Sequence, residues 1–156
     1  MWRFMDIKAF YDEPTNTVSY VVSDGAKGRA AIIDSVLDFD YASGTIGYDG
    51  ADTILAYISA HDLTVDWHIE THVHADHLSA APYLQEKLGG KIGISQEIVT
   101  LQKVFGKMFN AGTQFERDGS QFDHLFTADE TYQIGNLRAR AMPTPGHTPA
   151  CMTHII

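Results

Sequence analysis

The residues best suited to chemistry in this sequence lie in one short segment, residues 71–77, which reads Thr-His-Val-His-Ala-Asp-His. His72, His74 and Asp76 are spaced by two, and His77 follows directly. In an extended segment side chains alternate between two faces, so the first three can point to the same side. Three imidazoles and a carboxylate are costly to bury without a partner, and a divalent cation removes that cost. The segment therefore predicts a metal site.

A further candidate ligand, His147, lies in residues 144–149, Thr-Pro-Gly-His-Thr-Pro. Its prolines and glycine restrict the backbone, which suits a ligand that must be held in place. Taken alone, such a histidine is more typical of an exposed turn, and the first segment has a solvated polar loop as its alternative. That segment, however, is internal, follows a predicted strand and includes an acid. We therefore predict one shared metal site, with Asp76 also acting in catalysis, formed by His72, His74, Asp76, His77 and His147.

Strands are expected to position both histidine segments. A strand over residues 65–70 leads into the first segment, and one over 137–142 leads toward His147. A strand end followed by a helix start is where α/β proteins commonly bind ligands. Asp34 ends another predicted strand, where it either supports the site loop or simply terminates the strand. The remaining strands are predicted at 2–10, 17–23, 30–36, 91–95 and 131–134, the last paired with 137–142 through Gly-Asn.

Helices are predicted to alternate with the central strands. One spans residues 51–60, and a second is capped by Ser79 and ended by Gly89-Gly90. A third spans residues 96–110, where Ile98, Leu101, Phe105 and Met108 have helical spacing and are expected in the core. Residues 38–50 read as a polar loop, longer than most connections. This order indicates an α/β layer architecture with helices covering the sheet.

Length and composition narrow the class of protein. The chain has 156 residues, enough for one domain over residues 1–156. Its net charge of −9 argues against nucleic-acid and anionic-membrane partners, because both need a basic face. No apolar run approaches the roughly 20 residues of a membrane span, and the first residues do not resemble a signal peptide. We expect a soluble, cytoplasmic protein.

Together the two histidine segments resemble the signature of the metallo-β-lactamase superfamily, H-x-H-x-D-H followed by a later P-G-H-T. Here these motifs are residues 72–77 and 145–148. More narrowly, residues 70–79 and 144–151 look like the persulfide (sulfur) dioxygenase branch, which is close to glyoxalase II. The resemblance implies an αβ/βα sandwich, of which this chain holds the N-terminal half to two-thirds.

The resemblance also implies a ligand set. In persulfide dioxygenases a single Fe(II) is held by two histidines and one aspartate, with open positions for substrate and O₂. The matching histidines are His72 and His147, and the other candidates would orient them or bind metal-bound water. In the dinuclear hydrolases His72, His74 and His147 would hold one zinc, and Asp76 and His77 would contribute to a second. The family's further aspartate comes from a later Gly-Asp, which does not follow His147 here.

The residues and the resemblance are therefore compatible with three functions. The leading hypothesis is a mononuclear Fe(II) dioxygenase that oxidises a glutathione-type persulfide to sulfite with O₂. The second is a dinuclear zinc hydrolase of thioesters. The third is a C-terminally truncated domain that binds metal weakly, or that a second copy in a homodimer or a missing C-terminal segment completes. The expected partner is a small thiol or persulfide.

Overall fold

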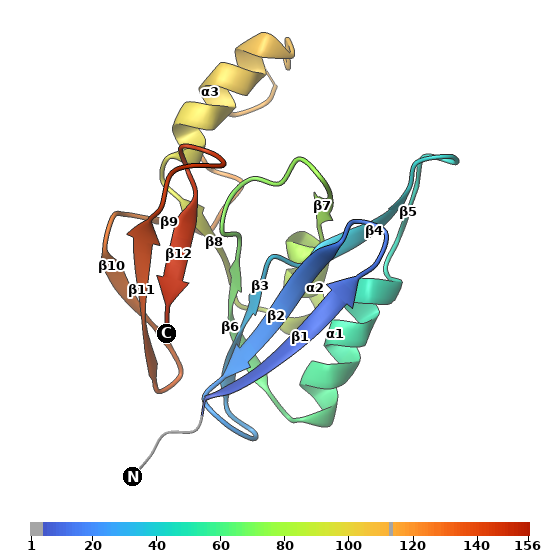
Figure 1. The fold of residues 1–156 in the computed structure, drawn as a ribbon, viewed down its shortest axis with the longest axis vertical. Helices are drawn as coiled ribbons and strands as arrows, with labels where there is room; N and C mark the ends of the chain where they lie inside the picture. The colour runs from blue at the N-terminus through green and yellow to red at the C-terminus, as the bar shows by residue number, and fades with distance from the viewer. Residues whose placement is uncertain (1–4, 113) are drawn as a thin grey trace.

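A six-stranded sheet lies at the centre of the molecule (Figure 1). The computed structural model describes residues 5–112 and 114–156. The strand order is β1-β2-β3-β6-β8-β9, and the strands are β1 (Asp6–Asp12), β2 (Thr17–Ser23), β3 (Arg29–Ile33), β6 (Thr64–Ile69), β8 (Lys91–Ser95) and β9 (His124–Phe126). β1, β2 and β3 pair antiparallel, whereas β3, β6, β8 and β9 run parallel. The carboxyl ends of the parallel strands therefore meet at one edge, a usual place for a site.

Helices and a second sheet cover the two faces of this sheet. α1 (Asp49–Ala60) and α2 (Ala81–Leu88) pack Ile54, Ile58 and Leu84 onto one face. The second sheet contains β10 (Glu130–Ile134), β11 (Leu137–Pro143) and β12 (Met152–Ile155), and it packs onto the other face around Phe126 and Ile69. The mixed α/β layer arrangement agrees with the prediction, but helices cover only one face of this sheet, and the second sheet covers the other face.

A three-stranded sheet corrects the prediction of a loop over residues 38–50. Its order is β5-β4-β7, with β4 (Val36–Asp40), β5 (Thr45–Gly47) and β7 (Leu78–Ser79). The loop prediction was wrong because only Asp40 and Gly44 serve the turn between β4 and β5, while Phe39 pairs opposite Ile46. The last two residues of the predicted loop, 49 and 50, already belong to α1. The β4–β5 hairpin, which we call the arm, projects from the body in Figure 1.

The strand predicted over residues 30–36 is interrupted. β3 ends at Ile33, and β4 starts at Val36. Between them Asp34 has a positive φ of 50°, which turns the chain out of the sheet. The single predicted strand was wrong because an apolar run does not reveal a backbone reversal at one polar residue.

Other predicted bounds need smaller changes. β2 and β8 have the predicted bounds, and β1 runs to Asp12, two residues beyond the prediction, while residues 2–4 lie outside the described part. The three-residue strand β9 was not predicted, because it is too short for a periodic pattern. The residue that caps α2 is Ala80, so the prediction of a Ser79 cap was wrong by one position. Ser79 still contributes, because its Oγ accepts a hydrogen bond of 3.0 Å from the Ala81 amide.

α3 (Ile98–Met108) is only partly packed against the body. Ile98 and Leu101 are buried as predicted, but Phe105 and Met108 are 42% and 65% exposed. The core prediction for these two residues was wrong because the helix runs past the end of the sheet, and no element of the described part of the chain covers this part of its apolar stripe. Figure 1 shows α3 extending away from both sheets. Among the described residues, every helix is too short or too polar to cross a bilayer.

Candidate metal centre

The first histidine segment leaves the sheet at the end of β6. Two backbone hydrogen bonds fix its start: the Glu70 amide donates to the Gly93 carbonyl at 2.9 Å, and the Asp34 amide donates to the Ile69 carbonyl at 2.9 Å. The chain bends at residues 71–72 and 75–77, so the expected alternation of an extended segment does not apply here. The bends nevertheless bring the rings of His72 and His74 together, with 4.2 Å between ring centres.

His147 reaches the same place from the loop between β11 and β12. Its ring centre lies 5.0 Å from that of His72, with the two rings nearly perpendicular. Two imidazoles bound to one ion at about 2.0–2.1 Å have ring centres roughly 5 Å apart. The Met152 amide donates to the Thr71 carbonyl at 2.9 Å, so a main-chain hydrogen bond joins the two histidine segments. The sequence prediction that residues 72 and 147 converge agrees with this geometry.

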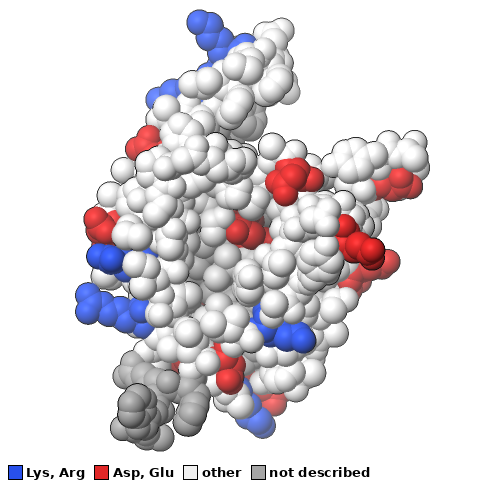
Figure 2. Space-filling model, in the orientation of Figure 1, with Lys and Arg blue, Asp and Glu red and all other residues white. Residues whose placement is uncertain are grey.

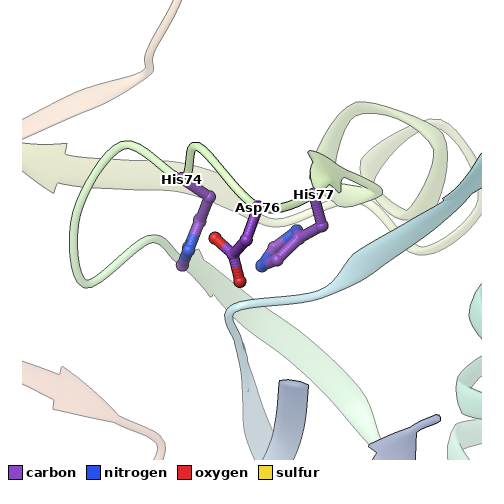
Figure 3. A group of neighbouring side chains, drawn as sticks. All are labelled: His74, Asp76 and His77. Atoms are coloured by element: carbon purple, nitrogen blue, oxygen red, sulfur yellow. The ribbon is translucent and has the colours of Figure 1, made fainter. Parts of the chain in front are cut away.

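A second group contains His74, Asp76 and His77. One potential ligand atom from each of these residues lies within 4.8 Å of the others, and Figure 3 shows the three side chains pointing toward one another. The rings of His74 and His77 are stacked, with centres 4.2 Å apart. All five predicted site residues therefore border one small region, which the structure divides into a pair and a triplet.

Hydrogen bonds assign the free nitrogen of each ring. Thr71 Oγ1 donates to Asp34 Oδ2 at 2.7 Å, so it must accept from His72 Nδ1 at 2.9 Å. His74 Nε2 donates to Asp34 Oδ1 at 3.0 Å, and His77 Nδ1 donates to the Leu78 carbonyl at 3.0 Å. In the neutral rings the lone pairs lie at Nε2 of His72, Nδ1 of His74 and Nε2 of His77, as ligand histidines require. Because the pKa of His74 is raised to about 10, this ring holds a proton at Nδ1 in the metal-free protein, and a metal ion bound there would displace that proton.

His77 Nε2 is the clearest sign that a cation fits this place. The atom is buried and has no hydrogen-bond partner among the described residues. A buried polar atom without a partner costs free energy, and a metal ion would remove that cost. The four imidazoles and the Asp76 carboxylate of this region are donors suited to zinc or iron. The residues therefore fit the metal that the motif implies.

Asp34 answers the question left open by the sequence. Besides the bonds from Thr71 Oγ1 and His74, its carboxylate accepts the Thr71 amide at 2.8 Å. Asp34 thus supports the site loop. Burial tends to raise the pKa of this carboxyl, but the hydrogen bonds from His74 and Thr71 outweigh it and hold the pKa below its usual value.

Glu70 is the site residue that the sequence reasoning missed. The residue is buried, its Oε1 accepts a hydrogen bond from Ser79, and its Oε2 lies 3.2 Å from His74 Nε2. Of the two contacts only the one to Asp34 has hydrogen-bond geometry, so Glu70 Oε2 is buried without a hydrogen-bond partner among the described residues. Burial raises the pKa of Glu70. An acid directly before Thr71-His72, at the end of a buried strand, was the available signal.

The surroundings of His74 and His72 shift the pKa values of these two rings in opposite directions. Burial alone would lower the pKa of His74, but hydrogen bonding and attraction to Asp34 and Glu70 raise it to about 10. Burial lowers the pKa of His72, which favours the neutral, ligating form. An open cavity of about 510 Å³ faces His72, His147, Asp34 and Asp76. A ligand in this cavity would reach the paired rings directly.

Comparisons with known proteins all indicate the same protein family. The model of the metallo-beta-lactamase superfamily matches residues 12–153. A protein of Burkholderia pseudomallei named as a metallo-hydrolase is 51% identical over 97% of this chain and 52% of its own length. Glyoxylase B2 of Dictyostelium discoideum is 40% identical over 96% of this chain and 52% of its own length. Persulfide dioxygenase ETHE1 of Bos taurus is 21% identical over 96% of this chain and 47% of its own length.

Solved structures show the same fold. The crystal structure of ETHE1 from Myxococcus xanthus matches with a TM-score of 0.71 and 23% identity, covering 96% of this chain and 53% of that one. This chain spans about half the length of the relatives given above.

Proposed function

Because this chain belongs to the metallo-beta-lactamase superfamily, we propose that it forms the metal-binding part of a dioxygenase for a small persulfide. The proposed cofactor is one Fe(II) on His72 and His147, and the proposed substrate is a glutathione-type persulfide. The observation that carries the proposal is the perpendicular pair of these two rings, 5.0 Å apart, on an open cavity. The persulfide dioxygenase among the relatives supports this choice of reaction.

The reaction has a simple balance. One persulfide, one O₂ and one water give one thiol and one sulfite, so the outer sulfur is oxidised and O₂ is reduced. Bound iron would supply a place where O₂ and sulfur meet and exchange electrons. His72 and His147 would hold the ion and leave other positions open for both reactants.

Two acidic residues would support this chemistry. The Asp76 carboxylate borders the same cavity, where it would accept the proton of the persulfide S–H, and a hydrogen bond of 3.2 Å from Thr17 Oγ1 holds it in position. Asp34 would keep the loop of His72 in position through Thr71.

A dinuclear zinc hydrolase of thioesters is the second candidate. The grouping of His74, Asp76 and His77 within 4.8 Å favours it, together with the unpartnered Nε2 of His77. In that case His74, Asp76 and His77 would hold a second zinc ion, and the two ions would supply Lewis-acid activation of water for thioester hydrolysis. Glyoxylase B2 among the relatives supports this alternative.

Metal content and substrate choice separate the two candidates. The protein is produced with iron and zinc both supplied, its metals are quantified, and O₂ uptake and sulfite are measured with glutathione persulfide. We expect about one iron per chain and sulfite formation, both lost in His147→Ala and kept in His61→Ala, an exposed control. Two zinc ions per chain with thioester hydrolysis that needs no O₂ would overturn the proposal. A chain with no bound metal would also count against the proposal. It would favour the third hypothesis, a truncated domain that binds metal weakly.

A further inference from the structure

The exposed apolar face of α3 belongs to a longer stripe. Ile98 and Leu101 bury the first part of the stripe. The helix then exposes Val104, Phe105 and Met108 by 50%, 42% and 65%, and Phe109, which directly follows it, is 72% exposed. The rings of Phe105 and Phe109 are stacked at 5.9 Å, which makes a broad aromatic surface. Monomeric proteins rarely expose so many large apolar side chains together, and such patches mark interaction sites.

A groove of matching character lies beside the arm. It has a volume of about 650 Å³ and runs between the arm and residues 74–78. Its apolar lining includes Phe39 and Ile46, and the aromatic side chain of Tyr41 at its edge is 76% exposed. Grooves of this kind commonly accept the apolar face of an amphipathic helix.

The two surfaces have opposite charge. α3 contains Lys103 and Lys107 and no acidic residue, and both lysines are exposed. The arm groove is lined by Asp12, Asp38, Asp40 and Asp49 and by no lysine or arginine of the described residues. Figure 2 shows basic side chains at the α3 end of the molecule and acidic ones on the arm. Such complementarity guides the register of an interface.

We propose that α3 of one copy of this chain binds in the arm groove of a second copy, and the reverse, in a two-fold dimer. A closed two-fold dimer uses the same patches on both copies. At about 200 Å² for a large side chain, the exposed fractions of the four α3 residues amount to about 460 Å². Phe39, Tyr41 and Ile46 add about 330 Å² on the same basis. The total of at most roughly 800 Å² per copy, reached when all of this surface is buried, comes up to the size of a standard interface.

The dimer would also border the metal centre. His74, Ala75 and His77 line the arm groove as well as the arm itself. The helix of the second copy would therefore lie against the segment that carries the metal ligands, and would cover one side of it.

Charge reversal gives a specific test, read by sedimentation equilibrium of the full chain across micromolar concentrations. Lys107→Glu and Asp49→Lys each place like charges across the proposed interface, and each should weaken self-association about tenfold. Asp49 is chosen because Asp38 and Asp40 also accept hydrogen bonds that shape the arm and its junction with α1. Mixing the two variants should restore dimers, because one contact becomes Glu–Lys and the other stays Lys–Asp.

Two controls accompany these variants. Lys27→Glu, in the turn between β2 and β3, makes the same change of net charge as Lys107→Glu. A third test variant, Phe109→Ser, removes an exposed apolar side chain from the proposed interface, and its control Ile7→Ser removes one from β1. We expect both controls to remain dimeric and Phe109→Ser to become monomeric, with circular dichroism reporting that each is folded. A monomeric parent chain, a dimer unaffected by Phe109→Ser, or two charge variants that do not recover on mixing would each overturn the proposal. The last result would indicate that α3 binds another surface.

Discussion

Replacing Asp34 tests whether one carboxylate holds the metal loop in place. Its oxygens accept three hydrogen bonds, from the Thr71 amide, Thr71 Oγ1 and His74 Nε2, at 2.8, 2.7 and 3.0 Å. In Asp34→Asn one oxygen becomes an NH₂ group, which faces donors and cannot accept. Asparagine also tolerates the positive φ of 50° at this position, so the backbone is not the variable.

The expected cost follows from these contacts. A hydrogen bond to a charged group contributes about 1.5–3 kcal/mol, and one to two such bonds are lost. We therefore expect the unfolding free energy of the metal-free protein to fall by about 3 kcal/mol. Because His74 loses its orienting partner, metal affinity should fall by roughly 10–100-fold. Urea unfolding and chelator competition with Zn²⁺ measure the two quantities.

Asp62→Asn is the matched control. Asp62 has a similar φ of 52°, but its carboxylate is exposed and pairs only with the exposed Lys27, at 3.3 Å, among the described residues. Such a pair contributes about 0–1 kcal/mol. If Asp34→Asn resembles this control in both stability and metal affinity, the assignment of Asp34 as the support of the loop is wrong.

Three other outcomes are expected. Burial lowers the pKa of His154 to about 4, so between pH 6.5 and 4 this histidine is protonated in the unfolded chain but not in the folded one. The unfolding free energy should therefore drop by up to about 3 kcal/mol from pH 6.5 to 4. In urea titrations His154→Asn should flatten this dependence on pH. Gly93→Ala places a Cβ 2.6 Å from Phe126 Cε2 and should cost about 1–3 kcal/mol, measured as a lower urea midpoint. Zn²⁺ at about 100 times its Kd should stabilise the parent chain by about 2.7 kcal/mol, and His147→Ala should remove most of that gain in thermal melts.

Each of these three predictions has a result that would contradict it. An unchanged pH slope in His154→Asn would mean that another group titrates in this range. A Gly93→Ala protein as stable as the parent would show that Phe126 can move aside at little cost. Equal stabilisation of the His147→Ala variant by Zn²⁺ would place the ion on the His74, Asp76 and His77 group.

The sequence was informative wherever its pattern was local. The hairpin around Gly135-Asn136 forms as predicted, and its second strand ends at Pro143, one residue beyond the predicted end. His72 and His147 could be predicted to converge because the motif carries both segments, and the structure brings their rings together. The metal assignment itself stays a prediction.

The features that the sequence did not predict depend on tertiary contacts. Asp34 looked like a strand end, and only the folded chain shows its carboxylate reaching across to Thr71 and His74. Glu70 was missed because its place directly before the histidine segment suggests a role in the site, but the burial of its side chain and its contacts with Ser79 and His74 appear only in the folded chain. Phe105 and Met108 follow the periodicity of a core stripe, but periodicity cannot reveal where the neighbouring sheet stops.

The hydrogen bond from the Met152 amide to the Thr71 carbonyl offers a way to follow assembly of the centre. Because both atoms belong to the backbone, substitution of any histidine leaves the bond chemically intact. Its amide proton should exchange with deuterium only when the strand after His147 separates from the loop before His72. Exchange at this one amide would therefore report opening of the centre in apo and metal-loaded protein alike, independently of turnover.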